Sequence, residues 1–572
     1  MFYRCPRCDL QVGGDMNEEA LSEETLALST SNHPPYSYEQ LGMQYIASSK
    51  ALEDLNLRIQ ELSTSLASLK KERAREAERN RLYISILHPI RRLPPELLTE
   101  IFRIRTYNGV DLQWKNFPGS LDTRKVPWVL GQVCRTWRLV AESTPDLWAK
   151  FNVIWTGTVS SERAAALEWL MTLHLEHAQE QPLDISFYSG SSSDSSHGRL
   201  QDRLLSLLCS RASQWRSARL QGDVNGLVHL RRFCGAFRSL TSLEIHFSDD
   251  DWTMDLISPF RVFEDCPSLT RFTLRGDPAV LLQEDNQIPW GQITRYEARE
   301  TEDWIPDSGE HFVVLSKLVR VEVCVLDTSL SSPSNPPPPS LATSSFHFLH
   351  TLILRYALQV ADMSMTPLLN WLILPSLRVL RFPNGLDCLV ELVDFLDRSE
   401  CSLEELTLAI DGNAVHSSHD FPGALTRLLE ASALRSLHTL QIRGMPWAAN
   451  SIRQRMWETI LESLTLGAKG NTLYIPRLRR LTLNGCEGVD STTTMRNHEA
   501  LCTMVSSRCF IELDVLDERG LCYLEEMTLW NFGIKGTIPL KQSSMDRLLE
   551  ISSTRGLTFS WYWGDLDWDI DD

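Results

Sequence analysis

A short pattern of apolar and polar positions returns many times along the chain. The pattern reads apolar-x-x-apolar-x-apolar, as in "LTSLEI" at 240–245 and "LRRLTL" at 478–483. Its copies begin 24 to 46 residues apart, a range that includes the spacing of leucine-rich repeats. Each copy predicts a short strand, and the residues between copies are expected to form helices on the convex side. The eleven copies start at Trp215, Leu240, Leu269, Ile293, Leu318, Leu349, Leu377, Leu403, Leu437, Leu478 and Leu524.

The residues between the repeated apolar positions vary from copy to copy. They show no dominant charge and no aromatic pattern, so the sequence does not indicate what the repeat surface binds. Two low-complexity segments, at 189–198 and 331–340, are predicted to be loops within the repeat and not domain boundaries. We therefore expect one continuous α/β solenoid over residues 160–560, followed by an acidic tail at 561–572.

The segment before the first copy predicts a helix and then a strand. "SERAAALEWLMTLHLEHA" at 161–178 is helical in pattern, and "PLDISFYS" at 182–189 is typical of a strand. His174 and His177 lie at i and i+3 on the predicted helix, but no third metal ligand accompanies them in the sequence. We interpret them as exposed polar residues.

Residues 45–82 carry a heptad pattern. Apolar residues recur there with 3-4 spacing, which places one apolar seam along a helix, and the seam ends at Arg73 and Glu76. Either a short coiled coil between two chains or a helix folded back on its own chain satisfies this pattern. The polar residues 1–44 before it are expected to be a flexible leader. The seam comprises Tyr45, Leu52, Leu55, Ile59, Leu62, Leu66 and Leu69.

Two helices with one apolar face each are predicted in residues 85–155. In "LPPELLTEIF" the apolar residues fall at i, i+1, i+4 and i+5, and Pro95 suits the first helical turn, where its missing N–H is not needed. "PWVLGQVCRTWRLVAE" at 127–142 predicts a second helix, which Pro145 ends. A unit of this size is marginal as an independent core. Either it caps the repeat with its leucines buried, or its apolar face lies in a partner's groove.

Composition and charge narrow the function classes. The chain has 572 residues, too many for one ordinary core, and its formal net charge of −18 argues against a nucleic-acid or anionic-membrane partner. It has no apolar run of membrane-spanning length and no signal-peptide core near the first residue. Thirteen cysteines scattered through apolar segments are typical of reduced thiols, so we expect the cytoplasm or the nucleus. The acidic segments at 248–255 and 561–572 are either solvated or attract a basic target.

The sequence contains no arrangement typical of a catalytic centre. A glycine-rich phosphate loop, a G-x-S-x-G motif and an H-E-x-x-H motif are all absent, so we predict no enzyme, no metal and no cofactor. Cys5 and Cys8 have the spacing of half a zinc site, and because no second pair follows, we interpret them as a chance pair. Cys266, Cys324 and Cys486 fall beside or within repeat segments, where small buried thiols are expected.

Two segments, together with the repeats, resemble a known family. "HPIRRLPPELLTEIF" at 88–102 followed by "LGQVCRTWRLVAESTPDLWAKF" at 130–151 resembles an F-box, the adaptor-binding module of cullin-RING ubiquitin ligases. "LPPELLTEIF", "LGQVCRTWR" and "STPDLW" are similar to mushroom-type (basidiomycete) fungal F-box proteins with degenerate leucine-rich repeats, and "PLDISF" and "QWRSARL" fit that group. The resemblance therefore implies an α/β leucine-rich-repeat-like solenoid with an all-α F-box before it and a short coiled-coil helix.

The resemblance implies a non-catalytic subunit of an SCF-type ubiquitin ligase. The F-box would bind a Skp1-like adaptor and through it a cullin, and the repeats would bind a target protein that the sequence does not identify. The alternative is a leucine-rich-repeat scaffold that acts outside a ligase. Phe102 and Val133 are 31 residues apart, which is more than a compact F-box needs. By position, the adaptor-binding residues are Leu93, Pro94, Pro95, Glu96, Leu97, Leu98, Ile101, Phe102, Val133, Cys134, Trp137 and Trp148.

Overall fold

The structure is a computed structural model, and its chain divides into two compact units. Unit 1 comprises residues 1–94 and unit 2 comprises residues 95–572. The described residues do not include Cys5, Cys8 or Cys486. They also do not include residues 190–194 and 331–340 of the two low-complexity segments, or residues 248–255 and 563–572 of the acidic segments. The described residues are 3–4, 11–12, 38–107, 119–155, 161–189, 195–222, 228–247, 261–276, 288–299, 308–328, 346–356, 366–382, 389–410, 421–444, 450–467, 474–484, 491–511, 520–530 and 542–562.

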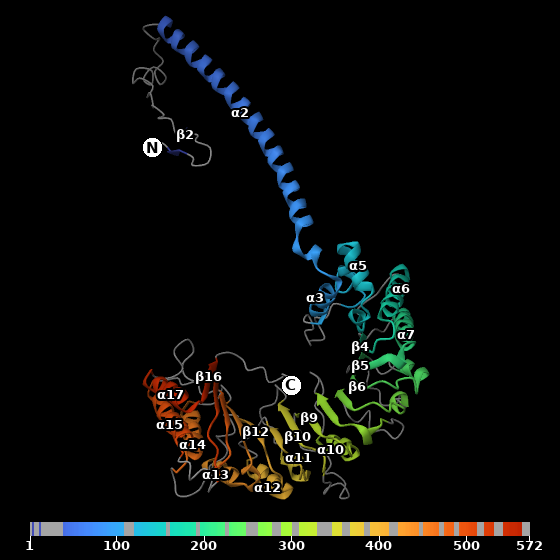
Figure 1. Cartoon of the computed structure of the whole chain (residues 1–572), viewed down its shortest axis with the longest axis vertical. Helices are drawn as coiled ribbons and strands as arrows, with labels where there is room; N and C mark the ends of the chain where they lie inside the picture. Colours follow the sequence, from blue (N-terminus) through green and yellow to red (C-terminus); the bar gives the residue numbers. More distant parts are fainter. Residues whose placement is uncertain are drawn as a thin grey trace. The chain divides into compact units, whose positions relative to one another are not determined.

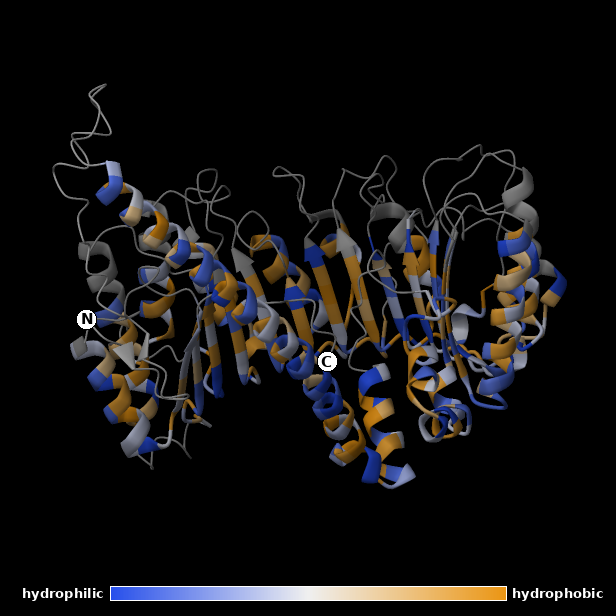
Figure 2. Ribbon diagram, turned by 90° about the horizontal axis from the view of Figure 1, so that it is seen from above, coloured by the Kyte–Doolittle hydropathy of each residue, from blue (hydrophilic) through white to orange (hydrophobic). Residues whose placement is uncertain are grey.

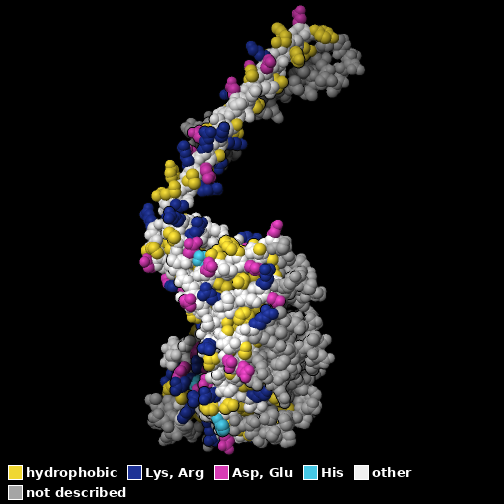
Figure 3. Space-filling model, turned by 90° about the vertical axis from the view of Figure 1, so that its right-hand side faces the viewer, with side chains coloured by type: hydrophobic (Ala, Val, Ile, Leu, Met, Phe, Trp, Pro, Cys, Tyr) yellow, Lys and Arg dark blue, Asp and Glu magenta, His cyan; other side chains and the backbone are white. Residues whose placement is uncertain are grey.

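A single long helix makes up most of the described part of unit 1. This helix, α2 (Tyr38–Leu87), begins before the heptad pattern and extends beyond it, so the leader ends earlier than residue 44. Within the leader, β1 (Tyr3–Arg4) pairs antiparallel with β2 (Gln11–Val12). No residue of α2 is buried, and Figure 3 shows hydrophobic, basic and acidic side chains interspersed along it.

Unit 2 is built on one parallel sheet of fourteen strands that follow one another in chain order (Figure 1). Because each strand between the two edge strands pairs with the strand before it and the strand after it, each repeat contacts mainly its neighbours, as in a solenoid. The α/β solenoid predicted from the sequence is confirmed at this level. The strands are β3 (Lys150–Trp155), β4 (Leu183–Ser189), β5 (Trp215–Gly222), β6 (Ser242–Phe247), β7 (Arg271–Arg275), β8 (Arg295–Arg299), β9 (Val323–Thr328), β10 (Thr351–Tyr356), β11 (Val379–Phe382), β12 (Glu405–Ile410), β13 (Thr439–Gly444), β14 (Arg480–Asn484), β15 (Glu526–Trp530) and β16 (Thr558–Tyr562).

Helices cover one face of the sheet and form the core with it. The apolar residues of the repeated pattern are buried on this face, for example Leu352 and Leu354 of β10, and the residues between them point to the other, open face. Figure 2 shows hydrophobic residues gathered on the strands and on the helices beside them. The helices are α6 (Ser161–Ala178), α7 (Ser195–Cys209), α10 (Ser308–Lys317), α11 (Thr366–Trp371), α12 (Leu389–Ser399), α13 (Phe421–Glu430), α14 (Asn450–Leu464), α15 (Ser491–Cys509) and α17 (Gln542–Arg555).

Two parts of the repeat differ from the sequence prediction in their local structure. Within the described residues, the connections from β5 to β8 contain 3₁₀ turns, η5 (Val228–Phe233), η8 (Arg261–Phe263) and η9 (Trp290–Gln292), where we expected helices. Here the repeats are among the shortest, and a 3₁₀ turn crosses the sheet with fewer residues than a helix needs. In addition, α7 begins at Ser195, inside the segment 189–198 that was predicted to be a loop.

One repeat copy was placed wrongly, and other strands were not recognised as repeats. The copy predicted to start at Leu318 starts at Val321, because Thr351 pairs with Val323 and Leu352 with Cys324. "LVRVEVCVL" holds two overlapping apolar patterns, and only pairing with the neighbouring strand distinguishes them. The strands β3 and β16 were not predicted, and β4 was predicted as a strand but not as a repeat. The sheet therefore begins at Lys150, within the range 85–155 assigned to the helical unit.

The helical unit before the sheet has three short helices and a 3₁₀ turn. They are α3 (Pro95–Tyr107), α4 (Trp128–Val133), α5 (Arg135–Glu142) and η3 (Pro145–Trp148). The second predicted helix is therefore divided. Cys134 adopts an extended backbone, and its Sγ accepts a hydrogen bond of 3.5 Å from the Trp137 N–H, so it ends α4 and caps α5.

The long connection between α3 and α4 is attached to the first strand of the sheet where the structure describes it. Residues 108–118 lie outside the described residues. Beyond them, the Ser120 N–H donates to the Asn152 carbonyl at 2.6 Å, and the Asn152 N–H donates to the Ser120 Oγ at 2.8 Å. The Trp128 indole N–H donates to the Ser120 carbonyl at 2.7 Å. Because β3 is the edge strand, these bonds satisfy backbone groups that would otherwise be unpaired.

Candidate functional site

The helix α3 has two apolar faces with different surroundings. Leu98 and Phe102, at i and i+4, are buried, with 2% and 1% of their surfaces exposed. Leu97 and Ile101 follow the same spacing on the other side and are 51% and 40% exposed. Ile104, at i+7 from Leu97, is 56% exposed and extends this outer stripe. One side of α3 thus packs within unit 2, and the other presents aliphatic side chains to solvent.

Aromatic rings and an ion pair hold α3 in place. The ring of Phe102 lies edge to face with the half-buried ring of Trp137 on α5, with centroids 5.0 Å apart. The Arg103 Nε donates to the Asp146 carboxylate of η3 at 2.5 Å. Below them, the buried Trp148 donates its indole N–H to the Ala141 carbonyl at 2.8 Å. These contacts join α3, α5 and η3 despite the long connection between α3 and α4.

The second part of the predicted site contributes further exposed apolar side chains. Val133 at the end of α4 and Leu139 on α5 are each 57% exposed, and Cys134 between the two helices is exposed as well. We name Leu97, Ile101, Ile104, Val133 and Leu139 the exposed apolar set. Its members lie on α3, α4 and α5, and α5 contacts both of the other helices.

The predicted entrance to the site is an extended turn. Leu93 has an extended backbone (φ −68°, ψ 133°), as expected for a residue before a proline, and it follows the 3₁₀ turn η1 (Pro89–Arg92). Pro95 is the first residue of α3, as the sequence predicted. Pro94, Pro95 and Glu96 are exposed, and Leu93 is half-buried.

The twelve residues predicted for the site therefore differ in burial. Leu98, Phe102 and Trp148 are buried inside unit 2, where they support the helices. Leu97, Ile101 and Val133 are exposed, as docking residues have to be. Sequence reasoning missed Ile104 and Leu139. The sequence did contain a signal for Ile104, because Ile104 continues the helical spacing of Leu97 and Ile101.

The histidines of α6 are not exposed polar residues, which corrects the sequence interpretation. His174 is fully buried between aromatic rings, and its Nε2 lies 3.0 Å from the Trp148 carbonyl. Its ring is 5.0 Å from the ring of Trp148 and 4.5 Å from that of Phe151. Burial lowers the pKa of His174 to about 3, so the imidazole is neutral at physiological pH. His177 also packs on Trp148, at 4.6 Å between ring centroids. Both histidines thus anchor the helical unit on α6.

Packing also buries most of the cysteines that the structure describes. Six of the nine described cysteines are buried, including Cys266 and Cys324, as the sequence predicted. Burial raises the pKa of the Cys266 thiol to about 12, which keeps it protonated and unreactive. In the part of the chain that the structure describes, no cluster of three or more His, Cys, Asp or Glu side chains could hold a metal ion. None of the described helices combines the length and apolarity that crossing a membrane requires.

Comparison with known proteins adds little to this description. No protein-family model matches the chain, and no curated protein matches it. Among solved structures, the chain is similar to the leucine-rich repeat-containing protein LegL7 from Legionella pneumophila, with 12% identity and a TM-score of 0.30. That match covers 71% of this chain and 98% of the other. The description of the repeat therefore rests on the chain's own strand order and register.

Proposed function

We propose that this protein is a non-catalytic F-box subunit of an SCF-type ubiquitin ligase. It would bind a Skp1-like adaptor, and through it a cullin, by the helices α3 to α5, and hold a target protein on its repeats. The observation that carries the proposal is the exposed apolar set on helices whose opposite side is already packed. Exposed aliphatic side chains gathered on neighbouring helices favour association, and a partner's groove would remove them from water.

The mechanism is proximity. A target held on the repeats would experience a high effective concentration of the ubiquitin-transfer machinery that the adaptor and cullin bring. In this role the chain supplies two binding surfaces and no nucleophile, acid or metal. It would act in the cytoplasm or the nucleus, where such ligases work.

The rival proposal is a repeat scaffold that acts outside a ligase. The burial of Leu98, Phe102 and Trp148 favours it, because these residues hold the helical unit together in the manner of a cap on the first strands. A cap, however, gives no reason for Leu97, Ile101 and Ile104 to form a second apolar stripe on the outside of α3. This outer stripe favours the adaptor over the cap.

The test is co-purification with a Skp1 homologue after co-expression. We expect wild type to retain the adaptor and the double variant Leu97→Asp with Ile101→Asp to lose it, because two charges would enter the apolar contact. Leu549→Asp is the matched control, since Leu549 is a 47% exposed leucine on α17, in the repeat. Thermal unfolding of all three proteins shows whether they fold alike. The proposal fails if wild type retains no adaptor, or if the double variant and the control retain it equally.

We also propose that α2 associates with a second copy of the chain. A helix of 50 residues without a buried residue gains little stability from helix propensity alone and needs a packed face. The seam leucines are well exposed, from 53% at Leu66 to 63% at Leu62. Their heptad spacing suits pairing with an identical helix, which would bury the seam of both.

A further inference from the structure

The last strand of the sheet has a neighbouring strand on one side only. Among the described residues, β16 pairs with β15, and no strand pairs with its other edge. The first strand differs, because Ser120 bonds the backbone of Asn152 on β3. An edge strand with free N–H and C=O groups is a template for another strand, and the terminal repeats of a solenoid normally act as caps.

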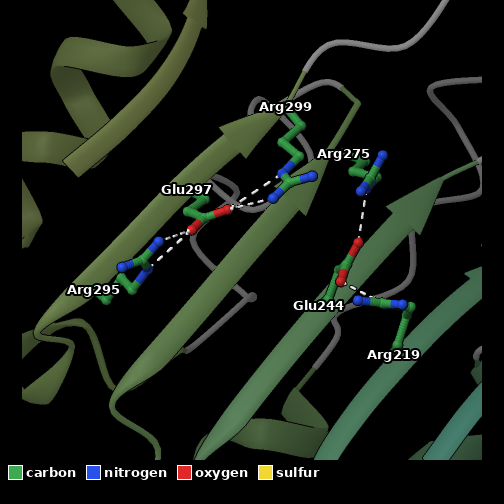
Figure 4. Close-up of polar contacts among 6 residues, drawn as sticks. All are labelled: Arg219, Glu244, Arg275, Arg295, Glu297 and Arg299. Carbon is green, nitrogen blue, oxygen red and sulfur yellow. Dashed lines mark hydrogen bonds and ion pairs between the residues drawn. The ribbon is translucent and has the colours of Figure 1, made fainter. Parts of the chain in front are cut away.

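Inside the array, side chains also connect a strand to both of its neighbours. On the open face, the Glu244 carboxylate of β6 accepts from Arg219 of β5 at 2.6 Å and from Arg275 of β7 at 2.7 Å (Figure 4). Among the described residues, β16 makes contacts of this kind with β15 only, for example between the hydroxyls of Thr528 and Ser560, which are 3.4 Å apart. The other side of β16 is therefore where a further strand could be added.

The aromatic side chains of β16 are less well covered than the matching side chains of β15. Phe559 and Trp561 are in register with Met527 and Leu529, on the face that the helices cover. Met527 and Leu529 are buried, whereas Phe559 is half-buried and Trp561 is 43% exposed. The apolar pattern of the repeat thus continues into β16, but the layer that buries it in the interior repeats is incomplete there.

The backbone of β16 directs two N–H groups away from β15. The Thr558 N–H donates to the Glu525 carbonyl at 2.8 Å, so it points toward β15. Because successive N–H groups of a strand alternate in direction, those of Phe559 and Trp561 point to the free edge. The residues with incompletely covered side chains are therefore the same residues that can bond a further strand.

The sequence that follows β16 has the pattern of a strand with one apolar face. β16 ends at Tyr562, so it includes the first two residues of the acidic tail expected from the sequence. In "DLDWDI" at 565–570, the apolar residues Leu566, Trp568 and Ile570 alternate with aspartates. Strict alternation of this kind is typical of a half-buried strand. Residues 563–572 lie outside the part of the chain that the structure describes.

We propose that residues 566–570 pair antiparallel with β16 and cap this end of the sheet. Antiparallel edge strands are common on otherwise parallel sheets, and they need only a short connection. Here the connection would be the four residues Tyr562–Asp565, a common length for a hairpin, and it includes Gly564, which adopts turn conformations at no steric cost. Attachment to β16 also gives this segment a high effective concentration at the edge, which a separate partner lacks.

This connection length matches the side chains as well as the backbone groups. It places Leu566 opposite Trp561, and Trp568 opposite Phe559. Residues directly opposite each other share a face, so the apolar side chains of the tail would cover the aromatic ones of β16. A connection one residue shorter or longer would turn the aspartates to that face instead. In the proposed register the aspartates lie on the open face, where charges on a new edge strand hinder pairing with another chain.

The cap goes beyond the proposed function and does not depend on it. It concerns the edge of the sheet at β16, whereas the adaptor would bind α3 to α5, before the first strand. It also gives the acidic segment at 561–572 a role other than a solvated tail or a site for a basic target. The two proposals can therefore be refuted separately.

Hydrogen exchange of the full chain, followed by mass spectrometry, tests the pairing. In wild type we expect slow exchange in peptides that cover residues 557–562. A chain shortened to end at Tyr562 should exchange at least about tenfold faster there, because the N–H groups of Phe559 and Trp561 lose their acceptors. Exchange in peptides from β13 should be equal in both chains, which shows that the repeats remain folded.

Two variants of the full chain separate the apolar face of the tail from its charge. Leu566→Asp with Trp568→Asp should speed exchange in β16 as the shortening does. Asp567→Asn with Asp569→Asn is the matched control on the same segment and should exchange as wild type does. Protection of β16 that survives the shortening overturns the proposal, and if it also falls on dilution, a second copy covers the edge instead. Equal effects of the two variants overturn it as well.

Disulfide formation tests the register. Ser560→Cys with Asp567→Cys should form a disulfide in a glutathione redox buffer, because the register places these residues directly opposite each other, with Cβ atoms about 5 Å apart. Ser560→Cys with Asp571→Cys is the control and should stay reduced, since four residues along a strand add about 13 Å. The tryptic peptide 556–572 contains no Lys or Arg, so both cysteines remain in it, and loss of two hydrogen atoms reports the bond. A bond in neither variant, or equally in both, overturns the proposal.

Discussion

The ring of Phe102 on α3 meets the ring of Trp137 on α5 edge to face, with centroids 5.0 Å apart and planes at 61°. Phe102 and Trp137 lie on either side of the connection between α3 and α4. Their rings meet although this connection is longer than a compact F-box needs. Closing a long surface loop costs little more entropy than closing a short one, and Ser120 attaches the end of this loop to β3. The first helix therefore packs on the second part of the unit, and the length of the loop does not prevent it.

This ring pair should be a stabilising contact of the helical unit. Phe102→Ala removes a fully buried ring and should cost about 3–5 kcal/mol of unfolding free energy. A double-mutant cycle with Trp137→Ala should give a coupling energy of about 1 kcal/mol, the value typical of an aromatic pair. Urea unfolding followed by circular dichroism measures both quantities. Leu97→Ala, on the exposed side of the same helix, is the control and should change stability little; a cost equal to that of Phe102→Ala would contradict this assignment.

The proposed pairing of α2 predicts an oligomeric state. The mass in solution should be about twice the 65.3 kDa of one chain, measured by light scattering after size-exclusion chromatography. Leu62→Glu, in the seam, should return the protein to the mass of one chain, because a charge would lie in the apolar contact. Leu57→Glu is the matched control, since Leu57 is 57% exposed on the same helix but outside the heptad positions. A monomeric wild type, or equal effects of both variants, would exclude the pairing.

The buried His174 predicts a dependence of stability on pH. Its pKa is about 3 in the folded chain and about 6.5 when unfolded, so between these values the unfolded state binds a proton that the folded state does not. Stability is fully present above pH 6.5 and is lost as pH falls toward 3, by about 2 kcal/mol from this group at pH 5. His174→Gln removes the titration. The difference in unfolding free energy between pH 7.5 and pH 5 should therefore shrink by about this amount in the variant; an unchanged difference would show that His174 is not its source.

Arg508 should be a structural residue of the C-terminal repeats. Its buried guanidinium donates to three backbone carbonyls, those of Leu464 at 2.7 Å, Ile475 at 3.1 Å and Tyr474 at 3.0 Å. Burial lowers its pKa to about 10, so it stays charged at pH 7. Arg508→Met fills the space but leaves the carbonyls without donors, and it should cost about 3 kcal/mol or more in urea unfolding. Arg477→Met, at an exposed arginine nearby, is the control and should leave the unfolding midpoint unchanged.

The apolar pattern by itself determined the strand order and most of the strands of this protein. In a solenoid each strand pairs with the next one along the chain, so ten of the eleven repeat copies lie where the spacing placed them. Helical spacing likewise predicted α6 with both of its ends, and Pro95 predicted the start of α3. These features depend on contacts between neighbouring residues or neighbouring repeats. The order of those residues and repeats along the chain is known from the sequence.

Tertiary structure decided the features that depend on contacts between distant residues. Pairing with Thr351 and Leu352 selected one of the two overlapping patterns around Val321. Packing against Trp137 distinguishes Phe102, which is buried, from Ile101, which is exposed, although both belong to one apolar run. Arg271 and Arg295 are 24 residues apart in sequence, and only the parallel register places them opposite each other on adjacent strands. Single positions in each repeat look unrelated along the chain, but the parallel sheet brings them within about 5 Å of one another.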